Sequence, residues 1–159
     1  MKFVIIKQVC ILSFILGLAL GILLLIPAIN LLTFLFAMFL VGGAIVIFLK
    51  KFNLIGIVDL KEGAILGAIA GFASFIGLST TFVPISSLIR LIFSNYTGGF
   101  STLFLTSISG IIIGISMIIF AAIMSALLNS FSGLVAIWGY ELITGIKKGN
   151  NENYNFEIK

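Results

Sequence analysis

The chain has 159 residues and a formal net charge of +4; 61% of its residues are hydrophobic and only 9% are charged. About a quarter of the residues in a soluble domain are charged, so this composition excludes an ordinary soluble domain and indicates a membrane protein. The chain has no histidine and a single cysteine, Cys10. It therefore lacks the commonest general base, and an internal disulfide or a cysteine metal cluster is excluded.

The charged residues cluster and leave three long uncharged runs, over 8–49, 63–89 and 91–140. A spanning helix needs about 20 apolar residues, so the first run accommodates two spans, the second one, and the third one or two. The lysines occur singly or in pairs at the ends of these runs. That placement is typical of topology signals and not of a nucleic-acid surface.

The first predicted span covers residues 9–27, a run rich in leucine and isoleucine that inserts without help. A cleaved signal peptide is the alternative interpretation, because its apolar core precedes a small-residue cleavage site. Here the apolar run continues directly beyond the small residues around Gly21, which favours a retained helix. Gly17 and Gly21 form a GxxxG pair, and Pro27 with Asn30 predicts the turn that follows.

The second predicted span covers residues 31–49 and ends at Lys50 and Lys51, with Gly42 and Gly43 in its middle. Two interpretations of the glycine pair stay open. A broken helix lining a substrate path is one, and a close crossing with a neighbouring helix is the other. We favour the crossing, because no ionisable residue lies near the pair in the sequence.

The third predicted span covers residues 62–82 and opens with Asp59 and Glu62, which have the spacing of a capping box. Both carboxylates also favour the positive end of a helix. The alternative role for them is as ligands of a proton or cation at the membrane surface. We expect the cap.

Three glycines spaced by four, Gly63, Gly67 and Gly71, put a smooth face on this third helix. Glycine costs a soluble helix roughly 1 kcal/mol relative to alanine, whereas in a bilayer it allows a neighbouring helix to approach closely. Large side chains, such as those of Ile65 and Phe72, lie opposite. The pattern predicts helix packing on the glycine face and lipid on the other.

Pro84 begins a short segment with serines and Arg90 on one face and isoleucines and leucines on the other. It is too short to span and predicts an interfacial helix. Arg90 is a candidate ligand for an anionic headgroup or substrate, although we favour a solvated arginine that snorkels to the surface.

The fourth predicted span covers residues 102–128, with Gly110 and Gly114 as a third GxxxG pair. A break is expected at 129–133, followed by an amphipathic helix over 131–146 whose Trp138 lies at headgroup level. Residues 149–159 are polar and predicted to be a disordered cytoplasmic tail. Residues 1–148 thus form one predicted transmembrane domain.

With four spans, all the lysines fall on one side and Arg90 alone falls on the other. By the positive-inside rule both termini are then cytoplasmic and the protein lies in the cell (inner) membrane. A fifth span would nearly equalise the two sides. The lysines that share the cytoplasmic side are Lys2, Lys7, Lys50, Lys51, Lys61, Lys147, Lys148 and Lys159.

A scattered pattern joins the first three predicted helices. It consists of Pro27-x-x-Asn30, then Gly42-Gly43, then Glu62-Gly63-Ala64-x-x-Gly67-Ala68-x-Ala70-Gly71. The pattern resembles that of small uncharacterised bacterial integral membrane proteins with about four helices. The resemblance implies no particular activity.

These patterns together predict an all-α fold, a polytopic transmembrane four-helix bundle with short interfacial helices. The spans carry no ionisable residue of the kind that marks transport or catalysis, and we expect no enzyme activity, cofactor or metal. We expect a non-enzymatic accessory, scaffold or packing subunit; the alternative is a passive channel, a holin-like pore or a transporter component. The expected partners are the lipid bilayer and a second copy or another membrane protein, but not nucleic acid. The residues predicted to pack helices are Gly17, Gly21, Gly63, Gly67, Gly71, Gly110 and Gly114, and the candidate ligands are Asp59, Glu62 and Arg90.

Overall fold

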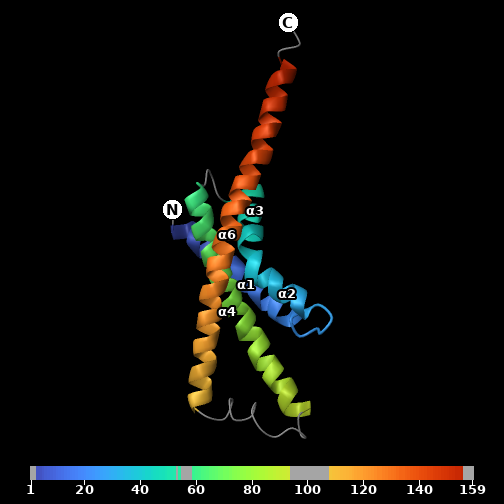
Figure 1. The fold of residues 1–159 in the computed structure, drawn as a ribbon, viewed down its shortest axis with the longest axis vertical. Coiled ribbons are helices and arrows are strands. Elements are labelled where there is room, and N and C mark those ends of the chain that lie inside the picture. Colours follow the sequence, from blue (N-terminus) through green and yellow to red (C-terminus); the bar gives the residue numbers. More distant parts are fainter. Residues whose placement is uncertain (1–2, 53, 55–58, 94–107, 156–159) are drawn as a thin grey trace.

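In the computed structural model the described residues are 3–52, 54, 59–93 and 108–155, and the regular elements among them are all helices (Figure 1). The chain order is α1 (Phe3–Leu23), α2 (Asn30–Phe39), α3 (Val41–Lys51), α4 (Leu60–Phe93) and α6 (Ile108–Asn155). By length and composition α1, α4 and α6 are each able to cross a bilayer. The bent pair α2–α3 is a fourth candidate span if the two helices count as one. The all-helical prediction is confirmed.

α1 ends at Leu23, earlier than the predicted boundary at residue 27. The N–H groups of Leu25 and Ile26 reach back only three residues, to the carbonyls of Ile22 and Leu23, each at 3.1 Å. Such bonds tighten the end of a helix, and proline then has no N–H with which to continue it. The turn expected at Pro27 is therefore present, but the helix has already ended before it.

The predicted second span is not one straight helix. α2 and α3 meet at Leu40 with a bend of 65°. Leu40 still donates to the carbonyl of Phe36 and accepts from the N–H of Ala44, both at 2.9 Å. Gly42 and Gly43 follow directly, and glycine is a weak helix former. The geometry of a broken helix, which the sequence left as the less favoured interpretation, is thus present.

α4 runs through Pro84 without ending, although the sequence predicted a separate interfacial helix from this residue. Proline has no N–H, so the carbonyl of Thr80 loses its usual partner in the helix. Inside a bilayer, neighbouring helices, Ser or Thr side chains and local adjustments of the helix can satisfy such a freed carbonyl, so proline is tolerated within a helix there. The side chain of Arg90 lies outside the described residues.

α6 also continues where a break was expected, at 129–133. The polar and small residues there face neighbouring helices and do not form a turn, since Asn129 is fully buried and Gly133 lies against Gly63 and Gly67 of α4. The segment predicted as a separate amphipathic helix, 131–146, is part of α6, as are residues 149–155 of the predicted tail. Residues 102–107 and 156–159 lie outside the described residues.

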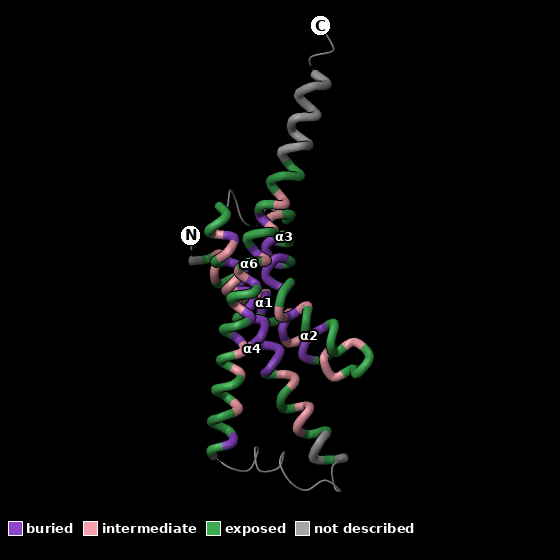
Figure 2. Tube along the Cα trace, viewed as in Figure 1, coloured by how far each residue is buried: buried purple, intermediate pink, exposed green. Residues whose placement is uncertain are grey.

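α4 is the helix around which the others pack (Figure 1). Its first half crosses α6 in the antiparallel sense, with Gly63 near Ile137 and Gly71 near Ser125. Its middle packs parallel to α1, with Gly21 near Leu78. Buried residues gather where α1, α3, α4 and α6 meet, and the first half of α6 is mostly exposed (Figure 2). The core comprises Val9, Leu20, Ala37, Val41, Ile45, Val46, Leu49, Leu66, Ala70, Leu78 and Ile137.

Candidate functional site

The most polar place in the buried core is the junction of α2 and α3, where the side chain of Asn129 on α6 enters the helix break. Its Oδ1 accepts a hydrogen bond of 2.6 Å from the N–H of Gly42. Its Nδ2 donates to the carbonyls of Ala37 at 3.1 Å and Met38 at 2.9 Å. One amide therefore serves both the end of α2 and the start of α3.

The chemistry of the amide explains why asparagine suits this position. A helix that stops exposes carbonyls, and a helix that starts exposes N–H groups. Asparagine carries an acceptor and two donors on one short side chain, so it can satisfy both kinds of group at once. The donation by Gly42 fixes the orientation of the Asn129 amide, since only the oxygen can accept.

Two serines on the same face of α6 complete the arrangement. Ser132 Oγ accepts from the N–H of Gly43 at 3.2 Å. Ser125 Oγ lies 3.2 Å from the carbonyl of Gly71 and 3.4 Å from that of Ala37, and it also lies 3.2 Å from Asn129 Nδ2. We call Ser125, Asn129 and Ser132 the Asn129 cluster. Their spacing of four and three residues aligns them on one side of a helix.

Glycines allow the three helices to come this close. A Cβ on Gly42 would lie 2.5 Å from the carbonyl oxygen of Asn129, and a Cβ on Gly71 would lie 2.6 Å from the Cβ of Asn129. Gly67 faces the backbone of Asn129 and Gly133 at similarly short range. Any larger residue at these positions would push α6 away from the break. Both interpretations of the Gly42–Gly43 pair therefore describe part of the observed geometry.

The predicted packing glycines divide into two groups. Gly17 and Gly21 of α1 lie against the backbone of Ser74 and Leu78. Gly63 contacts Ile137, where a Cβ would meet the side chain at 2.5 Å. Around Gly114, in contrast, nothing lies within 4 Å of a Cβ position, so no described segment packs there. Gly110 is buried near the start of α6.

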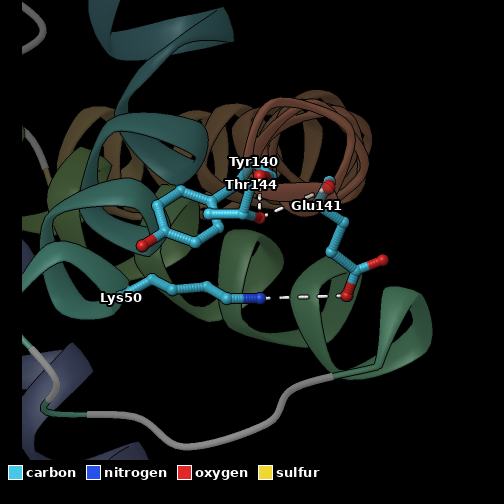
Figure 3. A network of polar contacts seen from close by, with 4 residues as sticks. All are labelled: Lys50, Tyr140, Glu141 and Thr144. Carbon is cyan, nitrogen blue, oxygen red and sulfur yellow. Dashed lines mark hydrogen bonds and ion pairs between the residues drawn. The ribbon is translucent and has the colours of Figure 1, made fainter. Parts of the chain in front are cut away.

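A polar network joins Lys50, near the end of α3, to Tyr140, Glu141 and Thr144 of α6 (Figure 3). Lys50 Nζ lies 3.8 Å from Glu141 Oε1 and 5.0 Å from the centre of the Tyr140 ring. Thr144 Oγ1 donates to the carbonyl of Tyr140 at 2.6 Å. The Glu141 side chain is half exposed, so the ion pair stabilises the fold by no more than about 1 kcal/mol. The sequence does not predict this pair.

The candidate ligands lie towards the two ends of α4, with Asp59 and Glu62 at its start and position 90 near its end. Asp59 directly precedes α4 and its carbonyl accepts from the N–H of Gly63 at 2.9 Å, as expected of a residue at the start of a helix. Its side chain is exposed, and Glu62 is half buried one turn later. The described residues contain no group of three or more histidine, cysteine, aspartate or glutamate side chains placed to hold a metal.

The Asn129 cluster can hold a bent helix in place, but it offers no ionisable group. All three of its side chains are neutral, and each is bonded to backbone groups of other helices. Throughout the described residues every fully covered side-chain nitrogen or oxygen has a partner. The sequence contains a signal for this cluster, namely the spacing of Ser125, Asn129 and Ser132 on one helical face, whereas the break predicted at 129–133 is absent.

Comparison with protein families, with curated proteins and with solved structures finds no match to this chain.

Proposed function

We propose that this chain is a multi-pass membrane protein that acts, without chemistry of its own, as an accessory or scaffold subunit within the bilayer. The helix lengths support the membrane location, and so does the outer surface. Along the first half of α6 many large apolar side chains are exposed, among them Ile112 (59%), Met117 (65%) and Phe120 (61%). Water does not tolerate an apolar surface of this extent, whereas lipid does.

The charge distribution supports an orientation in which the end carrying Lys50 and Glu141 faces the cytoplasm. Lys51 and Lys61 belong to the same end, because α3 stops and α4 starts there (Figure 1). The turn between α1 and α2 lies at the opposite end and carries no charge. Under the positive-inside rule the lysine-rich end remains in the cytoplasm.

Cysteine labelling tests this orientation. In a Cys10→Ser background, Ala28→Cys in the α1–α2 turn should react with an impermeant thiol reagent on intact cells. Lys51→Cys should react only after the membrane is permeabilised. Both positions are exposed, so access to the reagent depends on the side of the membrane and not on burial. Labelling of Lys51→Cys on intact cells would reverse the orientation.

The observation that carries the accessory role is the way in which the polar groups of the bundle are used. The amide and hydroxyls of the Asn129 cluster bond to the backbone at the helix break, where a transported ion or solute would otherwise find its ligands. Asn129 is fully buried and so is Ser125. A neutral, covered cluster favours a packing role over a conducting path.

A transporter component is the second candidate, and the 65° break between α2 and α3 is the observation that favours it. Discontinuous helices in transporters present free backbone groups to ions and substrates. For this chain, a transporter function would require the Asn129 amide to release the carbonyls of Ala37 and Met38, so that an ion or substrate could bind to them.

Flux through vesicles separates the two functions. The purified full chain, reconstituted into liposomes, should leave the leak of protons, K⁺, Na⁺ and a small anionic dye equal to that of protein-free liposomes. The Asn129→Ala protein is the matched comparison. If ions passed through the break between α2 and α3, removal of the amide would change the measured flux. A protein-dependent flux that Asn129→Ala alters would replace the accessory role by the transporter role.

A further inference from the structure

A groove lies between α4 and α6 at the end of the molecule opposite to Lys50. Below their crossing the second half of α4 and the first half of α6 diverge (Figure 1). The start of α2 lies beside the gap, and the groove that results has a volume of about 500 Å³. Its walls are mostly hydrocarbon, from Phe34, Phe75, Phe82 and Met117 among others. This size is that of sites for small organic molecules.

One polar group in this wall has no partner. Ser79 lines the groove and is only 7% exposed, yet its hydroxyl makes no hydrogen bond within the described part of the chain. The neighbouring hydroxyls of α4 behave differently, since Thr80 and Thr81 donate to carbonyls one turn back, at 2.7 and 3.4 Å. Fully covered polar atoms in the described residues all have partners. The Ser79 oxygen is therefore not fully covered, and the groove is the space that Ser79 lines.

The depth of Ser79 in the proposed bilayer indicates what its hydroxyl would meet. Position 79 lies about 29 Å along α4 from Leu60, at 1.5 Å per residue. The hydrocarbon core of a bilayer is about 30 Å thick, so a span that begins at Leu60 places Ser79 in the far leaflet. Asn30, an exposed residue that begins α2, lines the same groove. The acceptors that a glycerolipid carries next to its acyl chains are the ester carbonyls.

We propose that the groove binds one glycerolipid, with an acyl chain between α4 and α6 and an ester carbonyl that accepts a hydrogen bond from the Ser79 hydroxyl. The apolar walls select a hydrocarbon chain, and the nearly buried, unpartnered Ser79 hydroxyl selects a lipid that carries an acceptor next to that chain. On α4, Phe75 lies about one turn before Ser79 and Phe82 about one turn after it, and both cover the acyl chain on one side. Met117 and Ala121 of α6 cover it on the other side. This inference rests on the proposed membrane location. It names a glycerolipid as the molecule that the proposed accessory protein binds.

Tryptophan quenching in detergent tests the site. Phe82→Trp in a Trp138→Phe background places a single fluorophore in the groove, and the probe is a glycerophospholipid with a brominated acyl chain. Quenching should saturate at one lipid per chain. The ester-linked lipid should bind more tightly than an ether-linked lipid with the same chains and headgroup, because the ether has no carbonyl. The same chain with its native Trp138 and Phe82, whose fluorophore is outside the groove, should show no saturable quenching.

Ser79→Ala identifies the hydrogen bond. This substitution should weaken binding of the ester-linked lipid roughly 2- to 12-fold, the effect of one neutral hydrogen bond, and leave binding of the ether-linked lipid unchanged. Thr80→Ala is the matched control, since its hydroxyl is exposed and already bonded to its own helix. Quenching that rises without saturation, equal affinity of the unsubstituted groove for both lipids, or occupation of the groove by a second copy in cross-linking would overturn the proposal. Flux and labelling do not depend on the groove, so those experiments judge the membrane location and accessory role separately.

Discussion

Asn129→Leu should lower the free energy of unfolding by about 3 kcal/mol, because it removes every hydrogen bond that the side chain makes at the helix break. Leucine has as many side-chain heavy atoms as asparagine and leaves no cavity, so the predicted loss is that of the hydrogen bonds. The N–H of Gly42 and the carbonyls of Ala37 and Met38 would remain without the amide. Each unsatisfied buried group costs about 1–3 kcal/mol, and hydrogen bonds inside membrane proteins fall at the low end of such ranges. Reversible denaturation in mixed micelles, followed by circular dichroism, measures the change.

Ser116→Ala on the same helix is the control for the Asn129 experiment. Its hydroxyl is exposed and bonds only to the carbonyl of Ile112, at 2.8 Å within α6. This variant should unfold within about 0.5 kcal/mol of the unsubstituted protein, as is usual for exposed positions. Equal stability of Asn129→Leu and Ser116→Ala would show that the amide does not hold the break.

The sequence predicted the helices better than it predicted their ends. Apolar runs and glycine spacing depend on local periodicity, and this periodicity correctly indicated the packing face of α4 and its exposed residues Ile65 and Phe72. Pro84 and Asn129 were both interpreted by local rules as helix breakers. In the structure Pro84 lies inside α4, and Asn129 is a contact residue in the middle of α6.

The helix break itself could not be predicted, because its partners are remote in the sequence. Gly42 and Asn129 are 87 positions apart, and no pattern within α2 or α3 indicates that an amide from α6 will serve both of their ends. Gly42 and Gly43 are weak helix formers, and on their own they leave both a broken helix and a close crossing open. The bend between α2 and α3 frees backbone groups, and the Asn129 amide bonds to them. Neither feature can be derived from its own segment of the sequence.

The same limit applies to the GxxxG pairs, which are alike in sequence and differ in surroundings. Gly67 and Gly71 lie against α6, while Gly114 faces open space in this chain. The motif permits close approach but does not say which helix approaches. The two kinds of position therefore predict opposite effects of the same substitution.

Gly67→Ala should lower the free energy of unfolding by about 2 kcal/mol, and Gly114→Ala should leave it unchanged or raise it by up to about 1 kcal/mol. A Cβ on Gly67 meets the Gly133 Cα at 3.0 Å and lies even closer to the Asn129 carbonyl oxygen. Both contacts are with backbone, so one helix must shift, and such overpacking costs about 1–3 kcal/mol. Alanine stabilises a helix by up to about 1 kcal/mol relative to glycine. Of these two positions, only position 114 has room for the added Cβ and can show this stabilisation in full.

Gly67→Ile tests the same contact with a larger group, and Ile65→Leu, which lies on the exposed face of α4, is its control. We expect the isoleucine variant to separate α4 from α6 and to lose cooperative unfolding in detergent, whereas Ile65→Leu should unfold as the unsubstituted protein does. The Asn129 cluster is affected as well, since α6 cannot move away from Gly67 without moving Asn129 out of the helix break. Gly67→Ala and Asn129→Leu should therefore be less than additive in combination, because either one already loosens the shared contact. Full additivity of the two changes would mean that packing at Gly67 and the hydrogen bonds at the break are independent.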